Sequence, residues 1–196
     1  MSEPDLIQFY ESSVEIEDCT FDSNNFASSE GIVVSGGSLS LTNSNFTAND
    51  GTSMLISSRL QLSVNVENCS FSHNKMERPI LDLFYLNATI TNCEFSRNHM
   101  GSSGQFGIIE AENCEIFMSH ITGTFNFGNW GTMLHALNSY STIYDSQFTA
   151  NKALFGGTFY LNKGNTTISR CEVIRYGLLY ISSNFWSFSF IEVQVM

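Results

Sequence analysis

Cysteine and histidine are the residues of this chain that could hold a metal ion or carry thiol chemistry. Five cysteines and four histidines occur. No two cysteines form the C-x-x-C pair that zinc sites and redox motifs use, and the histidines follow no common spacing. The sequence therefore predicts no metal site and no cofactor, and it predicts buried thiols without partners. The cysteines are Cys19, Cys69, Cys93, Cys114 and Cys171.

Carboxylates grouped with basic residues would indicate an enzyme that acts on polysaccharides. Lyases need Arg or Lys beside carboxylates that bind Ca²⁺, and hydrolases need several Asp residues on one face. Here the eight Lys and Arg residues are scattered, and Asp18, Glu67 and Asp145 occupy outward positions that form no cluster. We therefore predict no catalytic residues.

Four Asn-x-Ser/Thr sequons are candidate N-glycosylation sites. A chain this rich in Asn, Ser and Thr contains about four by chance, so their placement says more than their number. The first two should point outward beside an inward residue, and the last two should lie at a turn between strands. The sequons begin at Asn45, Asn68, Asn87 and Asn165.

Net charge limits the partners that the chain can bind. Eight Lys and Arg against 19 Asp and Glu give −11, which opposes binding to nucleic acid or to an anionic membrane surface. No stretch approaches the roughly 20 apolar residues of a membrane span, and MSEPDLIQFY at the N-terminus lacks the features of a secretory signal. Protein and carbohydrate remain as partners, the latter through FNFGNWG at 125–131, which we expect to bulge as a loop.

A repeat of about 25 residues runs through nearly the whole chain. Each copy contains a Cys or Ser after a short alternating segment, and the intervals between these residues are 25, 25, 24, 26, 27 and 25. Such a period indicates a solenoid. We call these positions the anchor column: Cys19, Ser44, Cys69, Cys93, Ser119, Ser146 and Cys171.

Two further columns follow each anchor. The second residue after it is apolar in every copy, and the fifth is usually Asn. Apolar residues spaced by two precede the anchor, which is the period of a strand. The Phe column contains Phe21, Phe46, Phe71, Phe95 and Phe148, with Ile121 in the fifth copy, and the Asn column contains Asn24, Asn49, Asn74, Asn98 and Asn151, with Thr124 in the fifth copy.

A second register is conceivable, because AENCEIF at 111–117 looks like VENCSF at 66–71. It would make Cys114 the anchor and give intervals of 21 and 32, whereas Ser119 gives 26 and 27. We prefer Ser119 and place Cys114 inside the preceding strand. Cys69 and Cys93 then share a column in neighbouring copies, where stacked strands seldom offer the disulfide dihedral, so we expect free thiols.

One such copy cannot bury its apolar face alone, but stacked copies share a continuous core. Equivalent strands stacked about 4.8 Å apart form parallel sheets. The sequence therefore predicts an all-β fold, a right-handed parallel β-helix of about eight rungs, as a single domain over 1–196. A leucine-rich repeat has a similar period, but it needs a denser Leu pattern and a helical return.

The phrases FDSN, FTAN, FSHN and FSRN, with GGTFYL at 156–161, resemble the FxxN and GG-apolar repeats of chlamydial polymorphic outer membrane proteins. They are also similar to β-helix repeats in large proteins of ciliates and other protists. The resemblance spans most of the chain. It implies a surface-exposed or secreted region used in adhesion or as a structural scaffold.

We therefore expect a non-enzymatic structural or adhesive module of an extracellular or cell-surface assembly. Strand-like sequence begins near Leu6 and the repeat reaches Val195 without a polar or helical cap. We accordingly expect a segment of a longer β-helix, or a subunit that packs end to end or laterally with itself or other chains. The alternatives are a carbohydrate-binding or polysaccharide-degrading fragment, and an intracellular scaffold of a cytoskeletal or ciliary complex.

Overall fold

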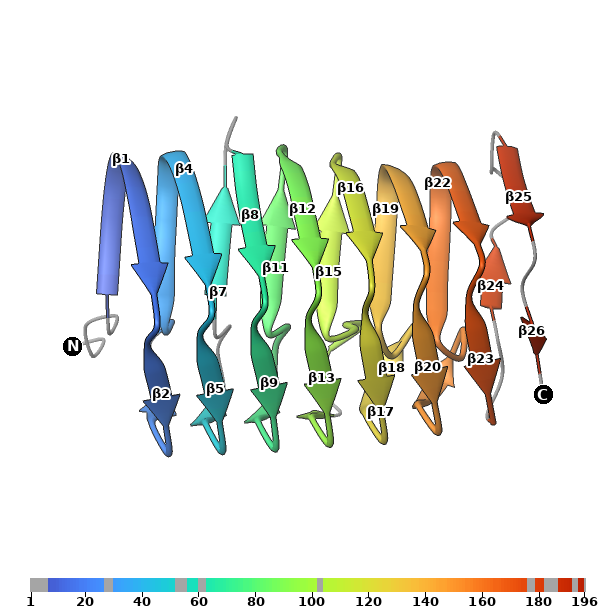
Figure 1. Cartoon of the computed structure of the whole chain (residues 1–196), viewed down its shortest axis with the longest axis horizontal. Coiled ribbons are helices and arrows are strands. Elements are labelled where there is room, and N and C mark those ends of the chain that lie inside the picture. The colour runs from blue at the N-terminus through green and yellow to red at the C-terminus, as the bar shows by residue number, and fades with distance from the viewer. Residues whose placement is uncertain are drawn as a thin grey trace.

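The structure is a computed structural model that describes residues 7–26, 30–51, 56–59, 63–101, 104–175, 179–181, 187–191 and 194–195. Every regular element in these residues is a β-strand, and they contain no helix that could cross a membrane. The strands stack into a column with three sheets along its sides (Figure 1). The predicted all-β parallel solenoid is confirmed.

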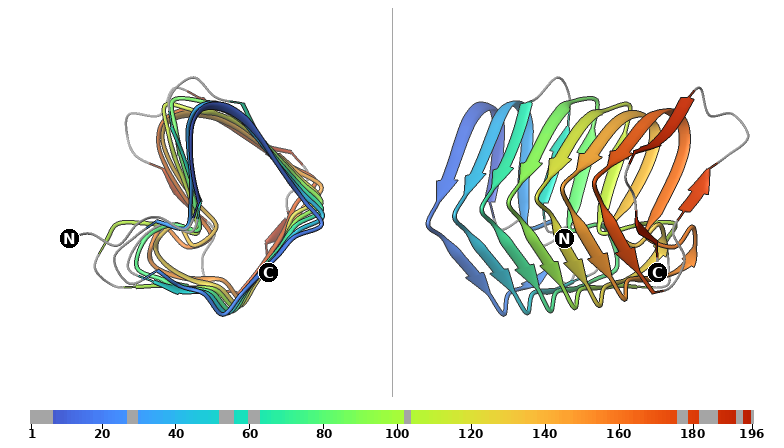
Figure 2. Two further views of the ribbon diagram at one scale, coloured as in Figure 1. Left: turned by 90° about the vertical axis from the view of Figure 1, so that its left-hand side faces the viewer. Right: turned by 45° about the vertical axis from the view of Figure 1, so that its right-hand side comes forward.

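The largest sheet has twelve strands and covers two sides of the column. Four of its strands have 11 residues and bend from one side onto the next, whereas other turns use two shorter strands. The end-on view in Figure 2 shows this bend repeated from turn to turn. The strands are β1 (Ile7–Glu17), β4 (Ile32–Thr42), β7 (Ile56–Arg59), β8 (Ser63–Glu67), β11 (Leu81–Phe84), β12 (Asn87–Thr91), β15 (Ile109–Glu112), β16 (Glu115–Ser119), β19 (Leu134–Tyr144), β22 (Phe159–Ser169), β24 (Leu179–Ile181) and β25 (Ser187–Ile191).

Two smaller sheets complete each turn. The eight-stranded sheet contains β2 (Thr20–Asp22), β5 (Asn45–Thr47), β9 (Ser70–Ser72), β13 (Glu94–Ser96), β17 (Thr122–Thr124), β20 (Gln147–Thr149), β23 (Glu172–Ile174) and β26 (Gln194–Val195). The six-stranded sheet contains β3 (Asn25–Phe26), β6 (Asp50–Gly51), β10 (Lys75–Met76), β14 (His99–Met100), β18 (Phe127–Trp130) and β21 (Lys152–Phe155). Strands of all three sheets are therefore described together in about six turns, fewer than the eight rungs predicted.

At the two corners that flank the eight-stranded sheet, one residue of each described turn lies in the left-handed region, which lets the chain turn sharply. The residue after it points inward. At the corner between the twelve-stranded and eight-stranded sheets, the φ angles lie between 48° and 53°. Asn and Asp tolerate this conformation better than most side chains, which explains why they recur there. We call these residues the corner column: Asp18, Asn43, Asn68, Asn92, His120, Asp145 and Arg170.

The anchor column follows directly inside the corner column, and its side chains bond the backbone of neighbouring turns. The Ser44 hydroxyl accepts a hydrogen bond from the Cys19 N–H at 3.1 Å and donates one to the Thr42 carbonyl at 2.8 Å. Cys69 donates from its sulfur to the Glu67 carbonyl at 3.2 Å. Ser and Cys share this position because both are small and can donate to the carbonyl two residues earlier.

The Phe column forms the apolar centre of the stack. Phe21, Phe46, Phe71 and Phe95 stack face to face, with ring centroids 4.7–4.9 Å apart. Phe46, Phe71, Phe95 and Phe148 are all fully buried. These rings point into the column as the strand period predicts.

The Asn column lies at the next corner and forms a continuous chain of amides. From Asn24 to Asn126, each Nδ2 donates to the Oδ1 of the Asn one turn later, at 2.9–3.0 Å. Each backbone N–H donates to the same oxygen, at 2.9–3.1 Å. The column therefore satisfies buried backbone groups that the corner leaves without strand partners.

The structure corrects the predicted register of the fifth copy by two residues. Thr91 pairs with Ser119 and Phe95 pairs with Gly123. Ile121, not Ser119, therefore continues the anchor column, Gly123 replaces Ile121 in the Phe column, and Asn126 replaces Thr124 in the Asn column. The interval there is 28 residues. The error arose because Ile121 is neither Cys nor Ser, while Ser119 stands two residues before it.

Gly123 leaves a gap in the Phe column that another side chain fills. A Cβ at this position would lie 2.7 Å from the Met133 sulfur and 3.0 Å from the Phe148 ring. The flexible thioether of Met133 thus occupies the space that a ring takes in other turns. The column stays closely packed although the repeat lengthens here.

Two further predictions of local structure are wrong. Cys114 lies between β15 and β16, at the corner where Asn113 has a φ of 56°, and not inside a strand. AENC and VENC look alike because both place an Asn at a corner before an inward Cys. The segment 125–131 does not bulge as a loop, because β18 (Phe127–Trp130) pairs with β14 and β21 in the six-stranded sheet.

Candidate functional site

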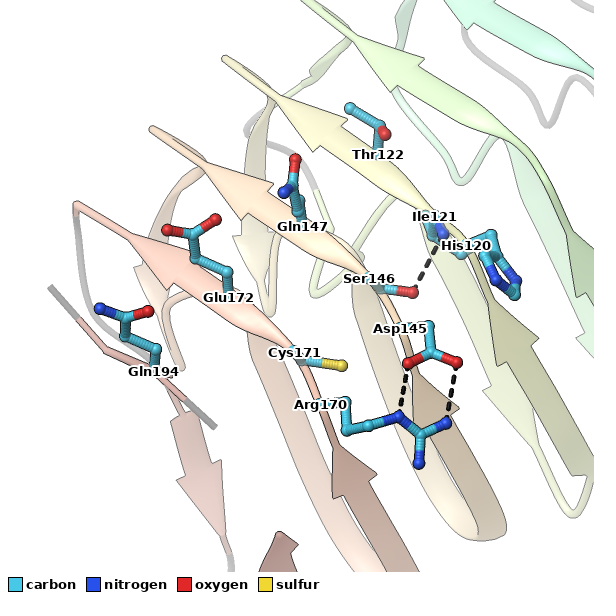
Figure 3. A pocket seen from close by; sticks show the side chains of 10 residues that line it. All are labelled: His120, Ile121, Thr122, Asp145, Ser146, Gln147, Arg170, Cys171, Glu172 and Gln194. Atoms are coloured by element: carbon cyan, nitrogen blue, oxygen red, sulfur yellow. Dashed lines mark hydrogen bonds and ion pairs between the residues drawn. The ribbon is translucent and has the colours of Figure 1, made fainter. Parts of the chain in front are cut away.

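A shallow groove follows the corner between the twelve-stranded and eight-stranded sheets. Its larger hollow, of about 660 Å³, spans four turns near β20 and β23. Figure 3 shows the corner-column side chains on one wall and the first residues of the short strands on the other. We call this feature the corner groove, and its larger hollow is lined by His120, Ile121, Thr122, Asp145, Ser146, Gln147, Arg170, Cys171, Glu172 and Gln194.

One wall carries an ion pair between successive turns. Arg170 Nε and Nη2 donate to the two Asp145 carboxylate oxygens at 2.6 and 2.8 Å (Figure 3). The Arg170 guanidinium also lies 5.5 Å from the centre of the Tyr144 ring. The bidentate geometry and the ring hold the guanidinium plane in one orientation along the groove.

The Arg170 hydrogen bonds keep the Asp145 carboxyl ionised. They lower its pKa from the ordinary value, with a smaller contribution from the charges of Arg170 and His120. A carboxyl whose pKa is lowered holds no proton at neutral pH and cannot act as a general acid there. Asp145 is therefore suited to orient Arg170 and to accept hydrogen bonds.

The other wall presents side chains that can donate and accept hydrogen bonds at regular spacing. Thr122, Gln147, Glu172 and Gln194 succeed one another along it (Figure 3). Their strands pair in register, so neighbouring side chains are about 4.8 Å apart. Hydroxyl, amide and carboxylate groups thus alternate along a straight line.

The corner groove continues toward the N-terminal turns. A second hollow of about 340 Å³ is lined by Asn68, Ser70, Asn92 and Glu94, and it shares His120 and Thr122 with the first. Cys69 and Cys93 lie at its floor. The two hollows together give an extended polar groove from Asn68 to Gln194.

The corner column shows that the outward acidic residues are not all scattered. Asp18 and Asp145 share it, but four other corner-column residues lie between them, so they form no cluster. Glu67 lies apart, on β8 opposite Thr91. The groove was missed in the sequence because its wall is formed by the residue before each anchor, and these residues differ in type from turn to turn.

Three sequons start at exposed positions and the fourth is half-buried. Asn45 lies in β5 and Asn68 in the corner column, both pointing outward as expected. Asn87 and Asn165 lie within β12 and β22, so their predicted turn position is wrong. The Asn165 Oδ1 is buried and has no hydrogen-bond partner. Glycosylation of the four remains a prediction.

A buried pair of titratable residues lies away from the corner groove. His135 on β19 pairs with Glu110 on β15, and their Nδ1 and Oε2 atoms are 2.8 Å apart. Both are more than nine-tenths buried, and His135 Nε2 has no partner. The Tyr160 ring lies 4.9 Å from the imidazole, and Trp130 packs 4.6 Å from Tyr160. The two residues are 25 residues apart, one repeat, so the period placed them on neighbouring turns, but nothing in their residue types indicated that they are buried.

We expect the Glu110 carboxyl to make folding stability depend on pH. Burial raises its pKa above the ordinary 4.5, although the hydrogen bond from His135 opposes this. The folded chain then binds more protons than the unfolded chain above about pH 4.5, so stability should fall as pH rises through the raised pKa. A single titrating group changes the free energy of unfolding by at most about 1.4 kcal/mol per pH unit.

Glu110→Gln should flatten this pH dependence, as measured by urea denaturation between pH 4 and 8. Glu115→Gln is the matched control, because it removes an exposed carboxylate of the neighbouring strand β16 that takes no part in raising the Glu110 pKa, and it leaves the His135 pair intact. The control should keep the wild-type slope. Equal slopes in Glu110→Gln and wild type would show that the buried carboxyl does not titrate in this range.

Metal binding finds no support in the described part of the chain. No group of three or more His, Cys, Asp or Glu residues there could hold a metal ion. The histidines lie in different surroundings: His73 at an Asn-column corner, His99 stacked on Phe127 at 4.7 Å, His120 in the groove and His135 in the buried pair. The described cysteines are all free.

Comparison with known proteins agrees with the observed fold. A family model described as a right handed beta helix region matches residues 5–192. The chain therefore belongs to the right-handed β-helix family. No curated protein sequence matches it.

Proposed function

We propose that the protein is a non-enzymatic structural or adhesive module that binds an extended, uncharged polar ligand along the corner groove. The observation that carries this proposal is the continuity of the groove: its two hollows share His120 and Thr122, and its walls offer new polar side chains in every turn. A rigid row of such groups matches a polymer that repeats along its length.

Carbohydrate is the ligand class that these walls favour. The net charge of −11 repels anionic polymers. Asp145 already neutralises Arg170, while Thr122 and Gln147 supply a hydroxyl and an amide that suit sugar hydroxyls. The flat, open shape of the groove suits a chain that lies along it.

Absence of catalysis is part of the proposal, because right-handed β-helices include both enzymes acting on polysaccharides and proteins without activity. The Asp145 carboxylate is held ionised by Arg170 and cannot protonate a leaving group at neutral pH. Glycoside hydrolysis needs such an acid together with a second carboxylate.

A cell-surface or extracellular location is the setting that we propose. The exposed sequons at Asn45 and Asn87 could accept glycans without disturbing the core, whereas a glycan on Asn68 would lie in the corner groove. The resemblance of the FxxN phrases to repeats of chlamydial polymorphic outer membrane proteins, and to those of ciliates and other protists, points the same way.

Retention on immobilised neutral polysaccharides tests the binding. We expect the wild type to be retained by at least one of a β-glucan, a mannan, a galactan and chitin. Thr122→Ala/Gln147→Ala should weaken this retention about tenfold or more, or about 1.4 kcal/mol. The matched control is Thr124→Ala/Thr149→Ala, which changes the same two strands on the same outward face but outside both hollows.

The outcomes separate the parts of the proposal. Equal losses in both double variants would show that the groove is not the binding surface. No retention on any of the four polysaccharides would contradict the carbohydrate ligand. Release of reducing ends or unsaturated sugars during incubation would contradict the non-enzymatic reading.

An intracellular scaffold is the second candidate, and the unpaired thiols favour it. All five cysteines are free, whereas extracellular chains usually pair theirs. Intact mass and glycopeptide analysis of native material separates the two settings. Glycans on any of the four sequons exclude the scaffold in the cytosol, and bare sequons with reduced cysteines support it.

A further inference from the structure

Cys69 and Cys93 are the only neighbouring pair of cysteines in the anchor column of the described turns. They are 24 residues apart. The strand partners on either side fix them opposite each other, because Glu67 pairs with Thr91 and Ser70 with Glu94. Their Cα atoms are therefore about one strand spacing, roughly 4.8 Å, apart, within the 4.4–6.8 Å that disulfides span.

The two thiols also share one local conformation. Asn68 and Asn92 precede them with the same φ of 53°. Cys69 Sγ donates to the Glu67 carbonyl at 3.2 Å, and Cys93 Sγ donates to the Thr91 carbonyl at 3.1 Å. Both side chains thus leave the backbone in the same direction, one above the other. This parallel arrangement does not itself provide the disulfide dihedral, so bond formation requires one or both side chains to rotate about the Cα–Cβ bond.

The two thiols also influence each other's ionisation. Their mutual contact is the main cause that lowers the pKa of Cys69 and raises the pKa of Cys93, and burial adds to the rise at Cys93. One thiolate is thereby favoured beside a protonated partner, and the thiolate is the reactive form.

A small reagent has a route to this pair. Both residues line the 340 Å³ hollow of the corner groove, between Asn68 and Asn92 on one wall and Ser70 and Glu94 on the other. Each is only 2% exposed. The hollow therefore admits a small oxidant more readily than a bulky one.

The other three cysteines lack a thiol in the neighbouring turn. Ser44 follows Cys19, and Ser146 precedes Cys171, in the anchor column. Cys114 lies at a different corner, one turn before Ser139, and burial raises its pKa from 9.0 to about 11. These thiols serve as internal comparisons.

We infer that Cys69 and Cys93 are a redox-active pair, which a hydroperoxide such as hydrogen peroxide converts into a disulfide between adjacent turns. The thiolate of either cysteine attacks the peroxide, the O–O bond breaks, and the departing hydroxide takes up a proton to form water. That cysteine is then a sulfenic acid. The sulfur of the other cysteine attacks it, the S–O bond breaks, and the oxygen leaves with the proton of the second thiol as a second water. Two thiols and one peroxide thus give one disulfide and two waters.

The disulfide would clamp two turns directly beneath the groove. It closes a 24-residue interval and ties Asn68 to Asn92 on the groove wall through their neighbours. Such a link restricts the unfolded chain and holds these turns together. Oxidation would therefore stiffen the N-terminal hollow without adding a group to it.

Stoichiometric treatment of the folded, full-length chain with hydrogen peroxide tests this inference. We expect the mass to fall by two hydrogen atoms, and two of the five thiols to resist alkylation after denaturation. Peptide mapping should place the link between Cys69 and Cys93. The denaturation midpoint should rise, and dithiothreitol should reverse both changes.

Serine variants give the matched controls, because Ser44 and Ser146 already occupy this column. Cys69→Ser and Cys93→Ser should abolish the mass loss, while Cys171→Ser and Cys114→Ser should retain it. Overoxidation of Cys69 to sulfinic acid, links between molecules, or a disulfide involving another cysteine would each overturn the inference. So would five alkylatable thiols after treatment of the wild type.

Discussion

Phe71→Ala should lower the free energy of unfolding by about 3–5 kcal/mol, the range for removing a large aromatic side chain from a core. The ring is fully buried, and it stacks on Phe46 and Phe95 with centroid distances of 4.9 Å on each side. Strand pairing holds both neighbouring rings in register. The cavity therefore has little freedom to collapse.

Chemical denaturation followed by circular dichroism measures this loss, and two variants make it specific. Phe71→Leu should cost clearly less, because it retains most of the buried apolar volume. Ser72→Ala changes the next residue on the outer face and should stay within about 0.5 kcal/mol of wild type. If Phe71→Ala resembled Ser72→Ala, the Phe column would not be the main support of these turns.

The sequence alone predicts most of this core, because each turn of a stacked fold needs the same kinds of residue at equivalent positions. Phe46 and Phe71 are one period apart and pair directly, so aligning the copies amounts to aligning the structure. The alignment failed only where Ile121 replaced the small polar anchor. The Asn column would have avoided the error, since Asn98 and Asn126 are bonded across the longer interval.

The candidate site was harder to predict because its residues share a position and not a type. Asn92, His120, Asp145 and Arg170 form one wall only because each occupies the left-handed corner before an anchor. The Glu110 and His135 pair was unpredictable for another reason. Strand alternation alone predicts an outward, hydrated position for both, and their burial depends on aromatic residues from other turns, such as Tyr160.

These features suggest a division of roles within each turn. The inward columns hold the stack together through apolar packing and amide bonds, and they leave the outward positions free to vary. The corner groove uses that freedom, because Arg170, Gln147 and Asn68 differ chemically while their spacing stays fixed. A ligand that binds there meets a rigid surface and requires little ordering of the protein.

Asn74→Ala should also be strongly destabilising, by about 3 kcal/mol, because it breaks the middle of the Asn column. The Asn74 Oδ1 accepts hydrogen bonds from the backbone and side-chain nitrogens of Asn49, at 3.0 and 2.9 Å. Its Nδ2 donates to the Phe46 carbonyl at 2.9 Å and to Asn98 Oδ1 at 3.0 Å. Each buried group left without a partner costs roughly 1–3 kcal/mol.

Asn24→Ala is the matched control, since Asn24 is half-buried and its amide bonds only toward Asn49. Its loss leaves the Asn49 oxygen with a backbone donor, the Asn24 N–H at 3.1 Å, so we expect a cost of about 1 kcal/mol in the free energy of unfolding.

Hydrogen exchange locates the effect: the Asn49 backbone amide should lose protection in Asn74→Ala and keep it in Asn24→Ala. Equal destabilisation by both variants would mean that each Asn side chain stabilises only its own corner, independently of the other Asn residues in the column. A larger loss at Asn74 would show that the chain of amides, continuous through neighbouring turns, couples the stability of one turn to the next.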